Sequence, residues 1–339
     1  MVKRTSWEVK YGLQFVASVT TDPTFASTVV IGVDVGIHGL PLTNHPDFVA
    51  GKTIIDTRKA IGIAQRRGGI GYEYQGEKLV PTVSFELEPS RKEIGALAWL
   101  LFQSGASEIG TTPFKKTYVP YVSTATGGCD CEVFCALMKD MGGGTTASEH
   151  QVIKGAICKS LAFNGTEGGA ITMTAEMLGS DHLATFTEGG SYALNFAGAA
   201  PLLFKDLVFT LDGVAVNCSA FSLTISNDAI SKAYNHGTTQ AYILKTMTCT
   251  GSVTIPWGET GAQTQIANWL SITPVPLTFA WGTAGVDEVK ISINARYTGA
   301  PIDLGGDEAV IPLAFDSVYY GSTGGIKLEV EDGVQRGIA

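Results

Sequence analysis

The sequence predicts a mainly β protein built from two tandem β-sandwich or half-barrel domains, each with one flanking α-helix. Three observations lead to this prediction. A run of alternating apolar and polar residues, then a proline, then a helical pattern occurs twice, about 170 residues apart. A pair of alternating strand patterns follows the helical pattern in each half. The chain also contains 41 glycines and many threonine, serine and valine residues, which suit strands joined by tight turns.

The chain has 339 residues, more than a single domain usually contains, so two domains are expected. We place the first domain at residues 1–180, with a long extended loop at 27–77. A linker is expected at 181–200 and the second domain at 201–339. Only 16% of the residues are charged, below the roughly 25% of an ordinary soluble domain. So little charge suits a surface that partners largely cover, as in the subunit of an assembly.

The net charge of −9 argues against a protein that grips nucleic acid, because that grip needs Lys and Arg to neutralise phosphates. The imbalance lies mainly in the second half, where 14 acidic and 7 basic residues follow from Thr185 onward. No long apolar run is present, so we expect neither a signal peptide nor a membrane span. The six cysteines are then expected to be reduced thiols of a protein made in a cytoplasm.

The elements are expected in the following order. Residues 1–25 form an arm with one short strand at 13–19. Residues 27–77 are glycine-rich and weakly patterned, and segments of this length are usually interaction loops. The basic residues of this loop are Arg58, Lys59, Arg66 and Arg67.

The first strand–proline–helix unit has a strand at residues 82–87 that ends before Pro89. Ser90 and Glu93 form a capping box, which predicts a helix at 91–103. The other elements expected in this half are a turn at Asn164-Gly165 and a half-buried strand at 171–177.

The second half shows clearer strand patterns. A hairpin is expected at residues 207–216 around the turn Asp212-Gly213. Further expected elements are strands at 221–225 and 249–255, a helix after Pro256 that ends near Trp269 and Leu270, and strands at 289–297 and 309–315.

No motif in the sequence indicates catalysis, so we expect no enzyme activity and no cofactor. The glycine-rich stretches lack the Gly-Lys-Ser/Thr ending of a phosphate loop. Ser180, Asp181 and His182 are adjacent in sequence, whereas catalytic triads are assembled from distant positions. Cys129, Cys131 and Cys135 lack the second Cys or His pair of a zinc site, so structural thiols are favoured over a metal site.

Several runs of strands and turns carry a family resemblance. They are residues 207–213, 221–227, 248–255, 289–301 and 308–315 in the second half, and 157–163 and 169–179 in the first. Together these runs resemble the tail tube (major tail) proteins of long-tailed bacteriophages. The resemblance covers more than half of the chain, and residues 27–77 and the cysteine-rich segment lie outside it.

The resemblance implies a structural subunit whose rings enclose a β-barrel wall and stack into a hollow tube. Each ring would contain three two-domain chains with pseudo-sixfold symmetry, or six chains. The tube would belong to a phage virion, be assembled in the host cytoplasm and carry the genome during ejection, without specific DNA binding or a membrane. Further partners implied are the tape measure protein and the tail terminator and distal tail proteins. A phage-derived injection device shares this pattern.

DNA must slide through such a tube without adhering, which favours small polar and acidic residues on the wall. We therefore predict that the polar faces of the late strands line the lumen, including Thr172, Thr174, Glu176, Ser292 and Asn294. Lys290 and Arg296 share this polar face and argue against a purely acidic wall. We further predict that Arg58, Lys59, Arg66 and Arg67 join rings by docking on the acidic second half of a neighbour.

Two other classes of protein fit parts of the pattern. One is a different β-rich virion protein, namely a capsid, decoration or fibre subunit, which would form shells or fibres. The other is a carbohydrate-binding module, which would stay small and bind a sugar.

Overall fold

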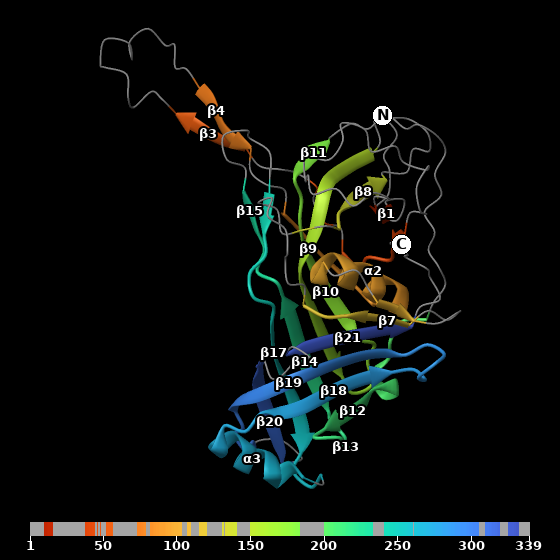
Figure 1. The fold of residues 1–339 in the computed structure, drawn as a ribbon, viewed down its shortest axis with the longest axis vertical. Helices are drawn as coiled ribbons and strands as arrows, with labels where there is room; N and C mark the ends of the chain where they lie inside the picture. Colours follow the sequence, from red (N-terminus) through yellow and green to blue (C-terminus); the bar gives the residue numbers. More distant parts are fainter. Residues whose placement is uncertain are drawn as a thin grey trace.

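A computed structural model describes residues 10–15, 38–44, 46, 48, 52–56, 73–78, 82–103, 107–109, 115–120, 131, 133–140, 150–183, 200–232, 241–259, 261–304, 309–318 and 325–331. They form an elongated molecule dominated by antiparallel strands, with α2 near its middle and α3 at one end (Figure 1). The prediction of a mainly β protein is confirmed.

Six antiparallel strands form a central layer, which we call the main sheet. In spatial order they are β5 (Thr82–Leu87), β10 (Thr172–Leu178), β9 (His150–Thr166), β14 (Ala220–Ser226), β17 (Thr248–Pro256) and β20 (Val310–Ser317). The pairing of β9 with β14 makes the sheet continuous between the N-terminal and C-terminal halves of the chain.

A second layer crosses the lower part of the main sheet (Figure 1). Its strands are β13 (Val214–Ala215), β12 (Val208–Leu211), β18 (Val275–Trp281), β19 (Val289–Gly299), β21 (Ile326–Glu331), β7 (Lys115–Tyr118) and β6 (Ser107–Ile109). The last residues of β19 pair with β20, so this strand joins the two layers.

The upper end of the molecule is built around the first residues of β9. The strands there are β8 (Cys135–Asp140), β1 (Lys10–Phe15), β2 (His38–Leu40) and β11 (Asp181–Leu183). Two further pairs form separate two-stranded sheets, β3 (Lys52–Asp56) with β4 (Glu73–Lys78) and β15 (Ile230–Lys232) with β16 (Ala241–Ile243). A short 3-10 helix, η4 (Phe204–Asp206), precedes β12.

The core lies between the main sheet and the elements that cover it. The rings of Phe221 on β14 and Phe279 on β18 are 5.2 Å apart, and Trp281 lies 5.9 Å from Phe221. This aromatic cluster holds the second layer on the main sheet, since buried aromatic rings contribute large apolar area.

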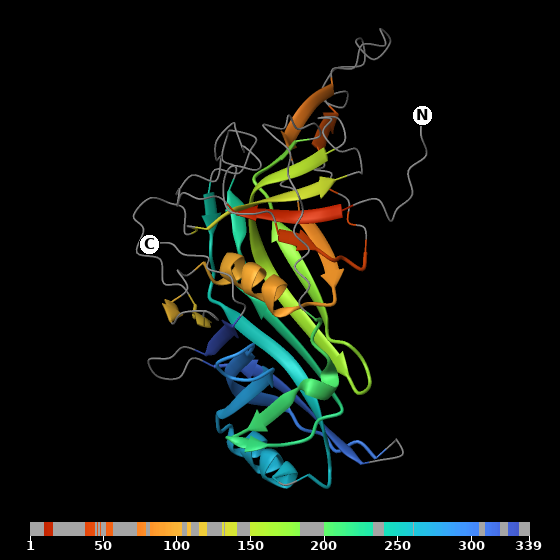
Figure 2. The same ribbon diagram turned by 90° about the vertical axis from the view of Figure 1, so that its right-hand side faces the viewer.

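The two helices differ in burial. In α2 (Arg91–Phe102) every residue from Glu93 onward is buried, and Tyr118 Oη donates a hydrogen bond to Gly95 O at 3.0 Å. The predicted capping box is confirmed, because Ser90 Oγ accepts from Lys92 N while Ser90 N donates to Glu93 Oε2. In α3 (Ala262–Ser271), by contrast, only Ala262 and Gln265 are buried. Figure 2 shows α2 against the strands and α3 at the far end.

The same succession of pairings occurs in both halves of the chain. In the first half, β1 pairs with β8, β8 with β9, β9 with β10 and β10 with β5, and α2 follows β5. In the second, β12 pairs with β18, β18 with β19, β19 with β20 and β20 with β17, and α3 follows β17. β11 and β21 each return to the first residues of the longest strand of their half.

The division into domains at residues 181–200 stays a prediction. β11 lies at the start of that segment, and the ladder between β9 and β14 crosses the boundary. Strand order repeats between the halves, and one apolar core spans both of them.

One predicted turn is wrong. Asn164 and Gly165 lie inside β9, and the chain turns at Glu167 and Gly168, where the glycine has φ +80°. Gly165 serves packing instead, since a Cβ there would lie 2.5 Å from the ring of Phe221. The N-terminal strand also begins earlier than predicted, at Lys10, and ends at Phe15.

Candidate functional site

The outward surface of the main sheet is the candidate functional site, and we call it the polar face. Its side chains alternate with buried apolar residues along all six strands, and none of them is buried. It consists of Thr82, Ser84, Glu86, Ser160, Ala162, Asn164, Thr166, Thr172, Thr174, Glu176, Ala220, Ser222, Thr224, Ser226, Thr248, Thr250, Ser252, Thr254, Pro312, Ala314 and Asp316. Most of these residues are serine or threonine, so the face is polar and low in charge, and its longest side chains are those of Glu86 and Glu176.

The strand register arranges these small side chains in rows. Thr174, Ala162, Thr224 and Thr250 are direct neighbours across four strands. In the adjacent row, Ser222 and Ser252 share a hydrogen bond between their hydroxyl oxygens at 3.0 Å. Adjacent strands lie about 4.8 Å apart, so the rows form a regular surface of hydroxyl and methyl groups. Such pairs of hydroxyl residues also stabilise the sheet.

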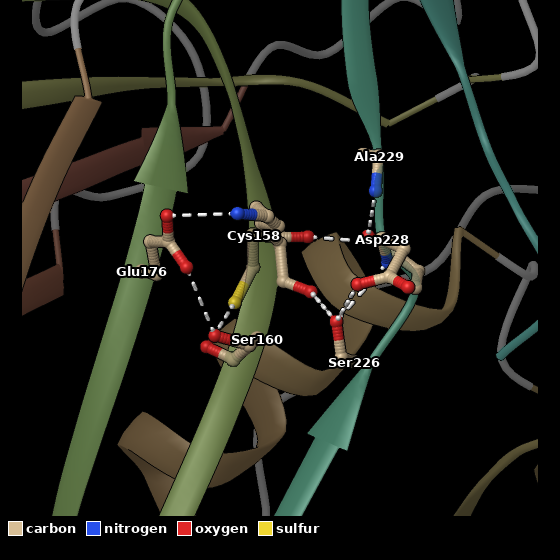
Figure 3. Close-up of polar contacts among 8 residues, drawn as sticks. Cys158, Ser160, Glu176, Ser226, Asp228 and Ala229 are labelled. Carbon is tan, nitrogen blue, oxygen red and sulfur yellow. Dashed lines mark hydrogen bonds and ion pairs between the residues drawn. The ribbon is translucent and has the colours of Figure 1, made fainter. Parts of the chain in front are cut away.

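Two basic residues, Lys159 and Arg296, lie beside this face. Arg296 is exposed on β19 and is the cross-strand neighbour of Asp316, and Lys159 has a carboxylate partner. It sits at a bulge in β9, and its Nζ lies 3.0 Å from Glu176 Oε1 on β10. Ser160 Oγ donates to the other oxygen of Glu176 at 3.4 Å. Figure 3 shows Glu176 facing Ser160. The ion pair is about one-third exposed, so its main effect is to neutralise the lysine rather than to add stability.

A second hydroxyl contact closes the same region from β14. Ser226 Oγ lies 3.3 Å from the backbone oxygen of Lys159 and 3.1 Å from Asp228 Oδ1, the two acceptors within reach of its one hydroxyl hydrogen. Figure 3 shows Ser226 beside Asp228. The four carboxylates of Glu86, Glu176, Asp228 and Asp316 therefore outnumber the two basic residues named here, Lys159 and Arg296.

The residues predicted for the lumen fall into two groups. Thr172, Thr174 and Glu176 are half-buried members of the polar face. Ser292 and Asn294 are half-buried on the outer side of β19 in the second layer, the same side as Arg296, which is the cross-strand neighbour of Asp316 of the polar face. Four strands, β9, β14, β17 and β20, lie between β10, which carries the first group, and β19, which carries the second.

The outer side of the second layer has a different chemistry. Lys115 Nζ lies 3.2 Å from Glu329, and Lys327 Nζ lies 3.1 Å from the same carboxylate. Burial alone would raise the pKa of Glu329, but the hydrogen bonds from the two lysines outweigh it and hold the pKa below its usual value. Glu288, 3.6 Å from Lys115, extends the set. This surface is a network of long charged side chains, unlike the polar face.

The basic residues Arg58, Lys59, Arg66 and Arg67 lie outside the described residues. The strands that flank them in sequence, β3 and β4, form a hairpin that projects from the upper end of the molecule (Figure 1).

The thiols show no sign of a reactive site. Cys131 and Cys135 are fully buried, and Cys129 lies outside the described residues. Burial raises the pKa of the Cys135, Cys158 and Cys249 thiols well above the usual value, and raises that of Cys218 to about 11. In the part of the chain that the structure describes, no group of three or more His, Cys, Asp or Glu residues could hold a metal ion.

The sequence indicated β14 and β17 as strands, but the predicted wall residues came only from β10 and β19. The missed signal was the serine and threonine alternation at residues 220–226 and 248–254. Pairing of these strands with β9 and β20 makes them part of the same face as Thr174.

A family model described as phage tail tube protein matches residues 8–318 of the chain. No curated protein matches the chain in sequence. Among the described helices, none is long and apolar enough to cross a membrane.

Proposed function

Because this chain belongs to the phage tail tube protein family, we propose that it polymerises into stacked rings and that the polar face lines the bore through which the genome is ejected. The observation that carries the proposal is the width and chemistry of that face. Six adjacent strands present small hydroxyl residues outward, Lys159 beside them is paired with Glu176, and Arg296 of β19 is the cross-strand neighbour of Asp316.

DNA passage explains this chemistry. A cation on the wall would attract backbone phosphates and hold the DNA, whereas carboxylates repel them over about one Debye length, roughly 8 Å at physiological salt. Thr172, Thr174 and Glu176 are wall residues on this proposal. Ser292 and Asn294 remain separate predictions, since they lie beside the charged network of the second layer.

The repeated strand order supports two tandem tube units within residues 1–180 and 201–339. Three chains would then supply six units to a pseudo-sixfold ring, whereas six chains would be needed if only one unit contributed. A closed ring also removes exposed sheet edges, which would otherwise pair without control. Axial contacts of the head-to-tail kind extend rings into an open filament.

The remaining parts of the proposal follow from the family. The tube would be a virion component assembled in the host cytoplasm, with tape measure, terminator and distal tail proteins as partners. The loop with Arg58, Lys59, Arg66 and Arg67 would join successive rings.

Electron microscopy of the purified chain tests the proposal. We expect hollow tubes or rings in negative stain, and a rotational average down the axis should show three-fold symmetry with six similar lobes. A chain that stays monomeric at high concentration would contradict the proposed function.

A further inference from the structure

Two apolar side chains are exposed at the end of β19 without a role in the single chain. Ile302 is 47% exposed and Leu304 is 75% exposed, just beyond the last residue of β19. The repeated strand order identifies their counterparts in the first half, and the environment of those counterparts shows what is missing here.

A bulge fixes the alignment of the two halves. The ladder between β9 and β10 skips Lys159, and the ladder between β19 and β20 skips Thr298. When the bulges are aligned, the bridge between Asp303 and Val310 coincides with the pair Asn164 and Thr172. Ile302 then corresponds to Phe163, and Leu304 corresponds to Gly165.

The counterparts are buried by a neighbouring strand. Phe163 is 1% exposed because β14 pairs along residues 160–166, with Leu223 directly beside Phe163 and Phe221 beside Gly165. On the corresponding edge of residues 299–304, no strand pairs within the described part of the chain. The second half therefore has the edge and its apolar residues but lacks the strand that would cover them.

A segment near the start of the chain occupies the place beside β5 that β14 occupies beside β17, and its described part consists of one bridge at Leu42 followed by bends at Thr43 and Asn44. Leu42 forms a bridge with Leu87 of β5, and Thr43 N donates to Glu86 O at 2.8 Å. Glu86 N donates to Asn44 Oδ1 at 3.0 Å. Counting onward from the bridge between Leu42 and Leu87 aligns Pro46 with Val83, as Leu223 of β14 lies opposite Gly251 of β17. Among the described residues, no strand pairs with the other edge of this segment.

We propose that residues 299–304 of one copy pair with the segment containing Thr43, Asn44 and Pro46 of a second copy, in the manner of β9 with β14. Ile302 then lies beside Pro46, and Leu304 lies beside Asn44. The proposal rests on the proposed ring and assigns its junction. This junction would join the main sheet of one copy to that of the next. The core side chains would then lie on one side of the joined sheet and the polar face on the other.

The prolines suit a junction of this kind. Pro46 and Pro301 lack an amide hydrogen, so neither strand is a good template for unselective pairing in the free subunit. The junction between copies then has fewer backbone hydrogen bonds than the pairing of β9 with β14 inside one chain. It depends more on the apolar contacts of Ile302 and Leu304.

The ends of the two helices support the same assignment. Both end at a left-handed C-cap residue, Gln103 with φ 54° and Ile272 with φ 55°. Two residues before the cap, Leu101 is fully buried, and its carbonyl accepts from Asn227 Nδ2, immediately after β14, at 2.9 Å. The corresponding Leu270 is 71% exposed, and Ile272 is 65% exposed. In the internal junction, the chain just after β14 covers the end of α2. A second copy that occupies the corresponding place would cover this end of α3.

A disulfide experiment tests the register. The variant L304C with N44C should form covalent dimers and higher multimers when assembled protein is oxidised and run on a non-reducing gel. The control L304C with T43C should form far fewer, because Thr43 precedes Asn44 by one residue and points to the opposite face of the sheet. Wild-type protein and the single variants report cross-links through native cysteines.

The outcomes separate this inference from the proposed function. Cross-linking of the first pair well above the control supports the junction. Tubes or rings without that cross-link overturn the junction while the tube function stands. A wild-type protein that forms neither rings nor tubes overturns both. As a second measurement, L304D should abolish ring formation while leaving the melting temperature of the subunit unchanged, and V286D, at an exposed site of 59%, should assemble normally.

Discussion

A lysine placed in the middle of the polar face should make the tube retain DNA. Thr224 is exposed, and its direct neighbours across the sheet are Ala162 and Thr250. The carboxylate of Asp316 lies two strands away, about 10 Å at the usual strand spacing, so the variant T224K would add a cation without a partner.

The expected effect follows from Coulomb's law. A phosphate about 5 Å from the ammonium group in water is attracted by about 0.8 kcal/mol. With three chains per ring, each ring would hold DNA by about 2.4 kcal/mol, roughly a 50-fold change in the binding constant. Salt should weaken the retention steeply, because the interaction is with exposed phosphates.

The assay is cosedimentation of short double-stranded DNA with purified open-ended tubes at low and high salt. T224Q controls for side-chain size, and V286K controls for an added charge outside the polar face. If T224K tubes retain no more DNA than V286K tubes, Thr224 does not face the bore and the assignment of the wall is wrong.

Three further predictions test the fold and the assembly. The variant G251A should destabilise the subunit by about 3 kcal/mol in urea unfolding, because a Cβ there would clash with Ser222 O and lie 2.9 Å from Phe315; unchanged stability would mean that this part of the main sheet is misplaced. Glu329 has a pKa below its usual value of 4.5, so it stabilises the fold above pH 4.5 and loses that effect as the pH falls through its lowered pKa. E329Q should therefore destabilise the subunit more at pH 7 than at pH 3, and an equal loss at both would exclude the ion-paired carboxylate. Deletion of residues 58–67 should leave rings that do not stack in micrographs, and tubes of normal length would remove the role of that loop.

Local signals were enough to predict the elements whose ends have a chemical cause. The capping box of Ser90 and Glu93 and the break at Pro89 identified α2 and β5, and the alternation at 248–255 identified β17. These signals depend on residues that are close together in the chain, so they can be recognised from the sequence alone.

The sequence could not predict which strands share a face, because that depends on pairing between distant residues. Thr174 and Thr224 lie in the same row because β9 lies between β10 and β14 and pairs with both strands. Gly165 shows the same limit, because its need for glycine comes from the ring of Phe221, 56 positions later, and not from a turn.

The contrast between the two outward surfaces is the strongest physical argument for a conduit. A surface that needs only to stay in solution is well served by long lysine and glutamate side chains of both signs, and the second layer has such a surface around Lys115, Lys327 and Glu329. The polar face belongs to the same chain and the same solvent, yet its positions are occupied by short hydroxyl residues and a few carboxylates. Solubility alone does not require that difference. A wall past which a polyanion must slide does, because each free cation on it would be a point of adhesion.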